Sequence, residues 1–150
     1  MTQISRLRLT FLAYRDNKKF MYKTRVYYQD TDAGGVVYFA NYLKFFEKSW
    51  VEYLFSIGIS LPEWEKSGTY VLIKNAFLDL IEKLRYGDII KVETTIREVR
   101  NAHFILSHKV FKDGKVTTKG ETKMVCVNEE GKPKRIPEDF KEKLLSQTRG

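Results

Sequence analysis

The sequence predicts an α+β domain in which a curved antiparallel sheet wraps around one long helix. Three observations predict it: a strand-like segment comes first, one long amphipathic helix follows, and four more strand-like segments come after that helix. Helices and strands do not alternate regularly, so the order favours an antiparallel sheet over a parallel one. With 150 residues, the chain has room for one domain with one core.

The first predicted strand covers residues 22–28. Tyr, Thr and Val residues at its even positions alternate with Lys, Arg and Tyr at its odd positions. This period of two indicates a half-buried strand. A loop follows over residues 29–35 and ends in the glycine pair Gly34 and Gly35.

The long helix is predicted from the spacing of its large apolar residues. These follow one another at steps of three or four, at Leu43, Phe46, Trp50, Leu54 and Ile57. Gly58 suits the end of this helix. Ser60 and Glu63 predict a capping box that opens a short second helix, and Gly68 suits its end.

Four further strands and a C-terminal helix complete the predicted fold. The strands cover residues 70–79, 89–99, 103–112 and 115–128. Asp113 and Gly114 between the last two strands fit the positive φ angles of a tight hairpin turn, so we expect these strands to be antiparallel. Pro137 opens the final helix. Such a sheet has an open edge, which favours dimerisation.

The net charge of +8 is concentrated at the start of the chain. Residues 1–25 contain seven basic residues and one acidic residue, a balance of +6, while the remainder carries +2. We expect residues 1–20 to form a basic N-terminal extension and residues 21–150 to form the domain. The extension is either an added strand or arm, or a flexible tail.

The composition also limits the chemistry and the compartment. Cys126 is the single cysteine, so no internal disulfide forms, and His103 and His108 are too few to complete a Cys/His metal cluster. This predicts a reducing compartment and a metal-free site. No apolar run approaches the roughly 20 residues of a membrane span, and the N-terminus lacks the pattern of a secretory signal. We therefore expect a cytoplasmic protein.

The loop before the long helix carries the residues best suited to catalysis. Asp30 and Asp32 precede the Gly34 and Gly35 pair, where the backbone can approach a ligand closely. The helix start then offers unpaired N–H groups that favour a developing oxyanion. A carboxylate facing such donors suits acyl transfer. Aspartates in this pattern also form ordinary turns, and both interpretations stay open on the pattern alone.

The same segment resembles a known family. Residues 28–47, 75–76 and 96–110 resemble the 4-hydroxybenzoyl-CoA thioesterases, which have the hotdog fold, and among them the YbgC-type acyl-CoA thioesterases. The resemblance covers about residues 21–145 and is most specific at the Asp-Thr-Asp-x-x-Gly-Val-Val-Tyr core. It implies a homodimeric or homotetrameric hydrolase of short-chain or aromatic acyl-CoA. Coenzyme A would be part of the substrate, and no separate cofactor is implied.

The resemblance also implies roles for individual residues. Asp32 would be the catalytic carboxylate, acting as a nucleophile or as a general base for water. A backbone N–H at Phe39 would polarise the thioester carbonyl. The side chain at this position is usually His in the YbgC-type branch and Tyr in the hydroxybenzoyl branch, so Phe39 removes any polar role of that side chain. Three residues would line the acyl pocket, namely Gly35, Tyr38 and Tyr42.

The coenzyme would meet the turn between the third and fourth predicted strands. There the resemblance points to Arg100, Asn101 and His103, together with Asn75 on the second strand. Arg100 is chemically suited because guanidinium pairs well with phosphate. An exposed charged turn without a ligand is the alternative interpretation.

Two other functions fit parts of the sequence. A thioesterase acting on acyl carrier protein would share the chemistry, and a basic surface suits an acidic carrier. A non-enzymatic module could bind anionic lipid or nucleic acid through residues 1–25. We do not expect nucleic acid as a partner, because the aromatic residues in this segment form no recognised binding motif.

Overall fold

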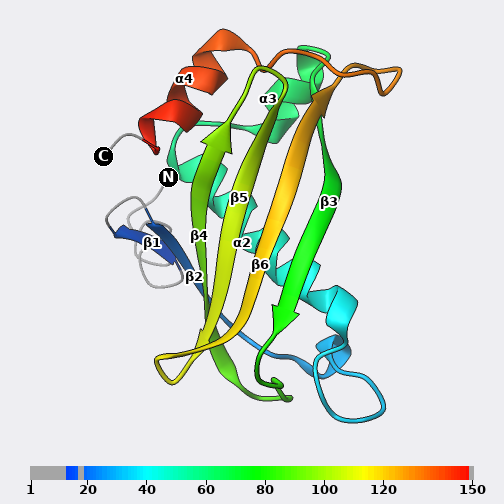
Figure 1. Cartoon of the computed structure of the whole chain (residues 1–150), viewed down its shortest axis with the longest axis vertical. Helices are drawn as coiled ribbons and strands as arrows, with labels where there is room; N and C mark the ends of the chain where they lie inside the picture. The colour runs from blue at the N-terminus through cyan, green and yellow to red at the C-terminus, as the bar shows by residue number, and fades with distance from the viewer. Residues whose placement is uncertain (1–12, 17–18, 149–150) are drawn as a thin grey trace.

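One antiparallel sheet curves around helix α2 (Tyr42–Ser56), as the computed structural model shows (Figure 1). The structure describes residues 13–16 and 19–148. Within them the sheet has six strands in the order β1-β2-β4-β5-β6-β3. Their bounds are β1 Ala13–Asp16, β2 Lys19–Arg25, β3 Tyr70–Leu80, β4 Ile89–Val99, β5 His103–Lys112 and β6 Lys115–Val127. The predicted α+β class is confirmed.

Short helical segments flank the central helix. Two 3-10 turns precede it, η1 (Tyr28–Asp30) and η2 (Phe39–Asn41), and η2 runs directly into α2. Helix α3 (Leu61–Lys66) follows it, and α4 (Glu138–Ser146) comes near the C-terminus. None of the helices in the described residues is long and apolar enough to cross a membrane.

Strand β2 lies three residues earlier than predicted. The expected alternation holds as far as Val26, which is fully buried, but Tyr28 is 78% exposed. The strand ends early because the backbone N–H of Tyr27 donates to the carboxylate of Asp30 (2.8 Å) and turns the chain into η1. This contact is the physical reason for the difference.

The sheet extends N-terminal to the boundary expected at residue 21. Strand β1 pairs antiparallel with β2 from Ala13 opposite Tyr22 to Asp16 opposite Lys19. Phe20 is buried, and its ring centroid lies 5.3 Å from that of Tyr53 on α2. Residues 13–16 and 19–20 therefore belong to the sheet. The rest of the predicted extension, residues 1–12 and 17–18, lies outside the described residues.

Of two local features predicted from the sequence, the hairpin turn is confirmed and the capping box is not. Asp113 and Gly114 have φ angles of +50° and +77°, as the predicted hairpin turn requires. The predicted capping box of α3 is wrong, because the Ser60 side chain makes no capping hydrogen bond. Instead the Trp64 N–H donates to the Ser60 carbonyl (3.1 Å), and the fully buried Trp64 side chain anchors the helix.

Helix α2 packs closely on the sheet at one point. The ring of Phe46 stacks on the imidazole of His108 in β5, with centroids 4.3 Å apart and planes 7° from parallel. Gly120, in the neighbouring strand β6, leaves room for the same ring. A Cβ atom added there would lie 2.4 Å from Phe46 Cε2. The helix can approach the sheet this closely only because position 120 has no side chain.

A buried chain of hydrogen bonds ties the same helix to three strands. Ser49 Oγ lies 2.7 Å from Thr94 Oγ1, which lies 3.0 Å from His108 Nδ1. His108 Nε2 then lies 2.9 Å from Thr122 Oγ1. Both ring nitrogens are therefore satisfied, as a buried polar side chain requires. Burial lowers the pKa of His108 to about 3, so the imidazole is neutral at physiological pH.

Replacing Gly120 by alanine should destabilise the fold. The added methyl group meets the Phe46 ring, and overpacking of this kind costs about 1–3 kcal/mol. Urea denaturation of the Gly120→Ala variant measures the loss. The cost should be smaller when Phe46 is also replaced by leucine. An equal cost in both backgrounds would show that the two side chains do not compete for the same space.

The stability of the fold should fall in mild acid because of His108. Its pKa is 6.5 in the unfolded chain and about 3 in the folded chain, so only the unfolded state binds the proton between these values. The free energy of unfolding should therefore drop by about 1.4 kcal/mol per pH unit below pH 6.5, and by up to about 5 kcal/mol at pH 3. In His108→Gln this component should vanish between pH 6.5 and pH 4.5, above most carboxyl titrations. Identical slopes for the two proteins would contradict the assignment.

Candidate functional site

The loop carrying Asp32 is a tight hairpin held by backbone hydrogen bonds. The Asp32 N–H donates to the Val36 carbonyl (2.9 Å), and the Gly35 N–H donates to the Asp32 carbonyl (3.0 Å). Gly35 has a φ of +81°. This is a three-residue hairpin loop closed by a left-handed residue, a position that favours glycine. The glycine at residue 35 thus sets where Asp32 stands.

The two aspartates of the motif have different surroundings. Asp30 is buried, and its carboxylate accepts the Tyr27 N–H, while its carbonyl accepts the Asn41 side-chain amide (2.9 Å). Asp32 is exposed, and its Oδ1 accepts the Gly34 N–H (2.8 Å). Within the described residues, Asp32 Oδ2 has no hydrogen-bond partner. Asp30 therefore shapes the loop, and Asp32 is accessible to a ligand.

Backbone donors come directly after this hairpin. The first hydrogen bond of the helical segment runs from the Asn41 N–H to the Tyr38 carbonyl (2.8 Å). The N–H groups of Phe39 and Ala40 precede it and so have no partner within the helix. Aligned peptide dipoles of the 15-residue helix α2 behind them add partial positive charge at this end. The arrangement can stabilise a negative oxygen near Asp32.

The residues predicted to line an acyl pocket lie in different environments. Gly35 and Tyr38 are exposed, and the Tyr38 ring packs at 4.8 Å from that of Phe39. Tyr42 is instead buried in the core, where its phenol hydrogen-bonds to Thr118 and to the backbone of Leu84. Desolvation by burial raises the pKa of this phenol. Tyr42 therefore belongs to the core, whereas Gly35 and Tyr38 are at the surface.

A second loop, over residues 81–88, flanks the Asp32 hairpin. The Val37 N–H donates to the Leu84 carbonyl (2.8 Å), and Val36 pairs with Arg85 in a short bridge. The guanidinium of Arg85 lies within contact distance of a Cβ built on Gly35. Tyr86 packs edge-on against Tyr28, with ring centroids 5.9 Å apart.

No motif in the sequence predicts a role for this flanking loop. The signal that could have identified it is Leu84, an apolar residue between the charged residues Lys83 and Arg85, which is fully buried in the structure. Its burial fixes the two residues that follow it, Arg85 and Tyr86, beside the Asp32 hairpin. Both side chains are exposed.

The predicted coenzyme contacts lie away from Asp32 in the same chain. The guanidinium of Arg100 binds the carboxylate of Glu98 through two nitrogens (2.9 and 2.6 Å), and Asn101 accepts a hydrogen bond from Lys141 (2.9 Å). Burial lowers the pKa of His103. These residues form the turn between β4 and β5, at the opposite end of the sheet from the Asp32 loop (Figure 1). One chain does not bring the two groups together.

Asn75 is separate from both groups of residues. It lies in the middle of β3, opposite Lys123 of β6, and its side chain is exposed. Strand β3 is an edge of the described sheet, since β6 is its one neighbour. Asn75 is therefore placed at a surface that a second molecule could cover.

Other reactive side chains are not suited to catalysis at neutral pH. Burial raises the pKa of the Cys126 thiol to about 12, so the thiolate is scarce. His108 is neutral and fully hydrogen-bonded in the core. Across residues 13–16 and 19–148, no group of three His, Cys, Asp or Glu side chains is placed to hold a metal ion. Asp32 is the accessible acid–base group next to backbone donors.

Comparisons with known proteins give similar sequences over most of the chain. A family model described as the thioesterase-like superfamily matches residues 26–144. The acyl-CoA thioesterase YbgC of Haemophilus influenzae is 33% identical over 124 residues, which cover 81% of this chain and 91% of that protein. The 1,4-dihydroxy-2-naphthoyl-CoA hydrolase of Microcystis aeruginosa is 32% identical over 117 residues, or 77% of this chain and 84% of that one.

A solved structure has the same fold. The crystal structure of a hypothetical protein from Aquifex aeolicus superimposes with a TM-score of 0.79 at 33% identity. The match covers 83% of this chain and 98% of the other.

Proposed function

The chain belongs to the thioesterase-like superfamily, and from this membership we infer that it hydrolyses acyl-coenzyme A thioesters to the free acid and coenzyme A. The family resemblance and the hotdog fold predicted from the sequence are confirmed. The named relatives favour this reaction over a carrier-protein thioesterase or a non-enzymatic binding module. One observation supports the assignment to residues: an exposed carboxylate, Asp32, stands in the hairpin that leads into η2 and α2.

We propose Asp32 as the catalytic carboxylate. Its Oδ2 is open to a ligand, and the hairpin fixes its position relative to the helix start. As a general base, Asp32 would take a proton from the water that attacks the thioester carbonyl. As a nucleophile, it would form a mixed anhydride that water then hydrolyses. In both routes the C–S bond breaks, and the coenzyme leaves as a thiolate that picks up a proton.

The backbone would stabilise the oxyanion. The thioester oxygen becomes negative during either attack, and the unpaired N–H groups of Phe39 and Ala40 are the donors nearest in sequence to Asp32. This role belongs to the main chain and does not need a polar side chain at position 39. The reaction would draw on water, the substrate and these residues, with no further cofactor proposed.

The surface around the loop suits a compact acyl group with aromatic character. Tyr28, Tyr38, Phe39 and Tyr86 are all exposed beside the Asp32 hairpin. Aromatic rings offer large apolar contact and stack on one another at ring distances of 4.5–7 Å. We therefore propose short-chain or aromatic acyl-CoA as the substrate class.

We propose that the working unit is a homodimer joined through β3. Large apolar side chains remain exposed along this edge strand and just beyond it, at Leu72, Ile73, Phe77, Leu80 and Ile81. The outer backbone groups of β3 face no strand in the described sheet. An uncovered apolar edge of 11 residues is a template for pairing with another chain.

Such a dimer would complete the site. If β3 pairs antiparallel with its own copy, the two sheets run in opposite directions. The turn between β4 and β5 of the second copy then lies at the same end as the Asp32 loop of the first (Figure 1). Arg100 and His103 of one chain would thus be near Asp32 of the other. This supports a coenzyme site shared between the two copies.

Substitution of Asp32 tests the catalytic assignment. We expect Asp32→Asn to lower kcat by about 10²–10⁴-fold, because the amide neither accepts the proton nor attacks the carbonyl. The amide oxygen can still accept the Gly34 N–H, so the melting temperature should not change. The assay compares hydrolysis of benzoyl-CoA and butyryl-CoA. Full activity in the folded variant would exclude Asp32 as the catalytic group.

Substitution of Phe77 tests the dimer. A charge placed on the edge by Phe77→Asp should dissociate the dimer and lower kcat/KM by about tenfold or more, with an unchanged circular dichroism spectrum. Sedimentation equilibrium measures the mass. The matched control is Phe55→Asp, since Phe55 is also about half exposed but lies on α2, away from β3. A dimer that survives Phe77→Asp, or a monomer with full activity, would contradict the proposal.

A further inference from the structure

We propose that the outer face of the sheet carries a second binding site, one that takes a small acid with a single carboxylate and an apolar body. The site is a pocket of about 410 Å³, a size typical of small-molecule sites. It is lined by residues of β2, β4 and the β5–β6 hairpin: Met21, Lys23, Ile89, Lys91, Phe111, Asp113 and Gly114. The proposal goes beyond the thioesterase function and does not depend on it.

The pocket opens on the face of the sheet away from α2. Its strand residues alternate with core residues: Phe20, Ile90 and Val110 are buried beneath the helix, while their neighbours Met21, Ile89 and Phe111 turn the other way. Asp32 stands instead in the hairpin that leads into η2 and α2. A ligand in the pocket is therefore on the opposite face from the proposed catalytic group.

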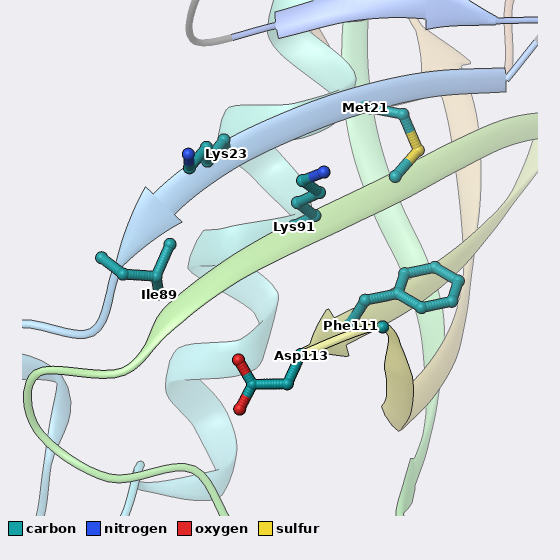
Figure 2. A pocket seen from close by; sticks show the side chains of 7 residues that line it. Met21, Lys23, Ile89, Lys91, Phe111 and Asp113 are labelled. Atoms are coloured by element: carbon teal, nitrogen blue, oxygen red, sulfur yellow. The ribbon is translucent and has the colours of Figure 1, made fainter.

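Apolar and cationic groups meet within one row of this face. Lys91 lies between Lys23 of β2 and Phe111 of β5, directly opposite each in the strand register. Figure 2 shows these side chains together with Met21. The ammonium group of Lys91 favours an anion at this point of the face. The aromatic ring of Phe111 and the Met21 and Ile89 side chains offer an apolar surface beside that charge.

The end of the pocket limits the ligand to one anionic group. Asp113 and Gly114 line the pocket at the turn between β5 and β6. Figure 2 shows the Asp113 carboxylate among the lining side chains. A second carboxylate or a phosphate on the far end of the ligand would be repelled by Asp113. The combination selects a monoanion whose other end is apolar.

The wall formed by the hairpin is fixed in place. Lys112 Nζ lies 3.0 Å from Asp88 Oδ1, which joins the hairpin to the residue just before β4. The other oxygen of Asp88 accepts the Arg85 N–H (2.8 Å). The hairpin turn itself is set by the positive φ angles of Asp113 and Gly114. A pocket whose walls are held before binding loses less entropy when the ligand enters.

Titration of the full-length protein, labelled with ¹⁵N, tests the site by NMR. Octanoate and benzoate serve as aliphatic and aromatic probes, and acetate and octylammonium as controls that lack the apolar body or the negative charge. We expect saturable shifts in the amides of residues 21–23, 89–91 and 111–114 with octanoate, benzoate or both. Acetate should bind about tenfold more weakly, and octylammonium should cause no shifts there.

Charge reversal separates a built site from a generally basic surface. Lys91→Glu should weaken binding of the carboxylate probe by about tenfold or more. The matched control is Lys109→Glu, an exposed lysine on the same face that does not line this pocket. It should retain the affinity within about twofold. Equal weakening in both variants, shifts confined to the Asp32 loop, or no shifts at all would each overturn the proposal.

Discussion

The contact of Phe46 with Gly120 and His108 determines where helix α2 lies on the sheet. The helix approaches closely because β6 has no side chain at residue 120, and the ring then stacks flat on the imidazole. One buried face contact would still allow rotation about the helix axis. The hydrogen bond of Ser49 to Thr94 removes that freedom, because it adds a directional contact one turn further along. The first turn of α2, with its unpaired N–H groups, is positioned as a consequence.

Features encoded within a single segment could be predicted from the sequence. The hairpin at Asp113 and Gly114 requires two residues that tolerate positive φ. Asp followed by Gly is a pair that does so, and the turn can therefore be recognised from these two residues alone. The end of β2 could not be predicted in the same way. The alternation of residue types in the sequence continues to Tyr28. The strand nevertheless ends earlier, because the Tyr27 N–H donates to the Asp30 carboxylate. That hydrogen bond competes with strand pairing, and the spacing of apolar residues in the sequence does not predict it.

The residues of the candidate site likewise fall into those that one segment of sequence predicts and those that depend on contacts between distant segments. The motif identified the Asp32 loop because its chemistry lies within a few consecutive residues. Pattern alone could not separate a catalytic aspartate from a turn-forming one, whereas the structure distinguishes the two residues: Asp30 is buried in the turn and Asp32 is exposed. Arg85 was missed because it reaches the loop through the packing of Leu84, about fifty residues along the chain. The role proposed for Arg100 would depend on a second chain, which no pattern within one sequence describes.

Successive side chains of a strand point to opposite faces of the sheet, so the two faces can differ in composition and in function. Every second residue is buried from Ile90 to Ile96 in β4 and from Phe104 to Val110 in β5, so the core beneath α2 depends on one face of these strands. The other face is free to carry charge, and Lys23, Lys91 and Lys109 stand there without disturbing the core. Strand β3 differs because it has one neighbour: Val71 and Leu78 pack against the core, while Leu72, Ile73, Phe77 and Leu80 remain exposed. The edge can therefore serve assembly, and substitutions on the outer face can change ligand binding while the helix and its donors stay in place.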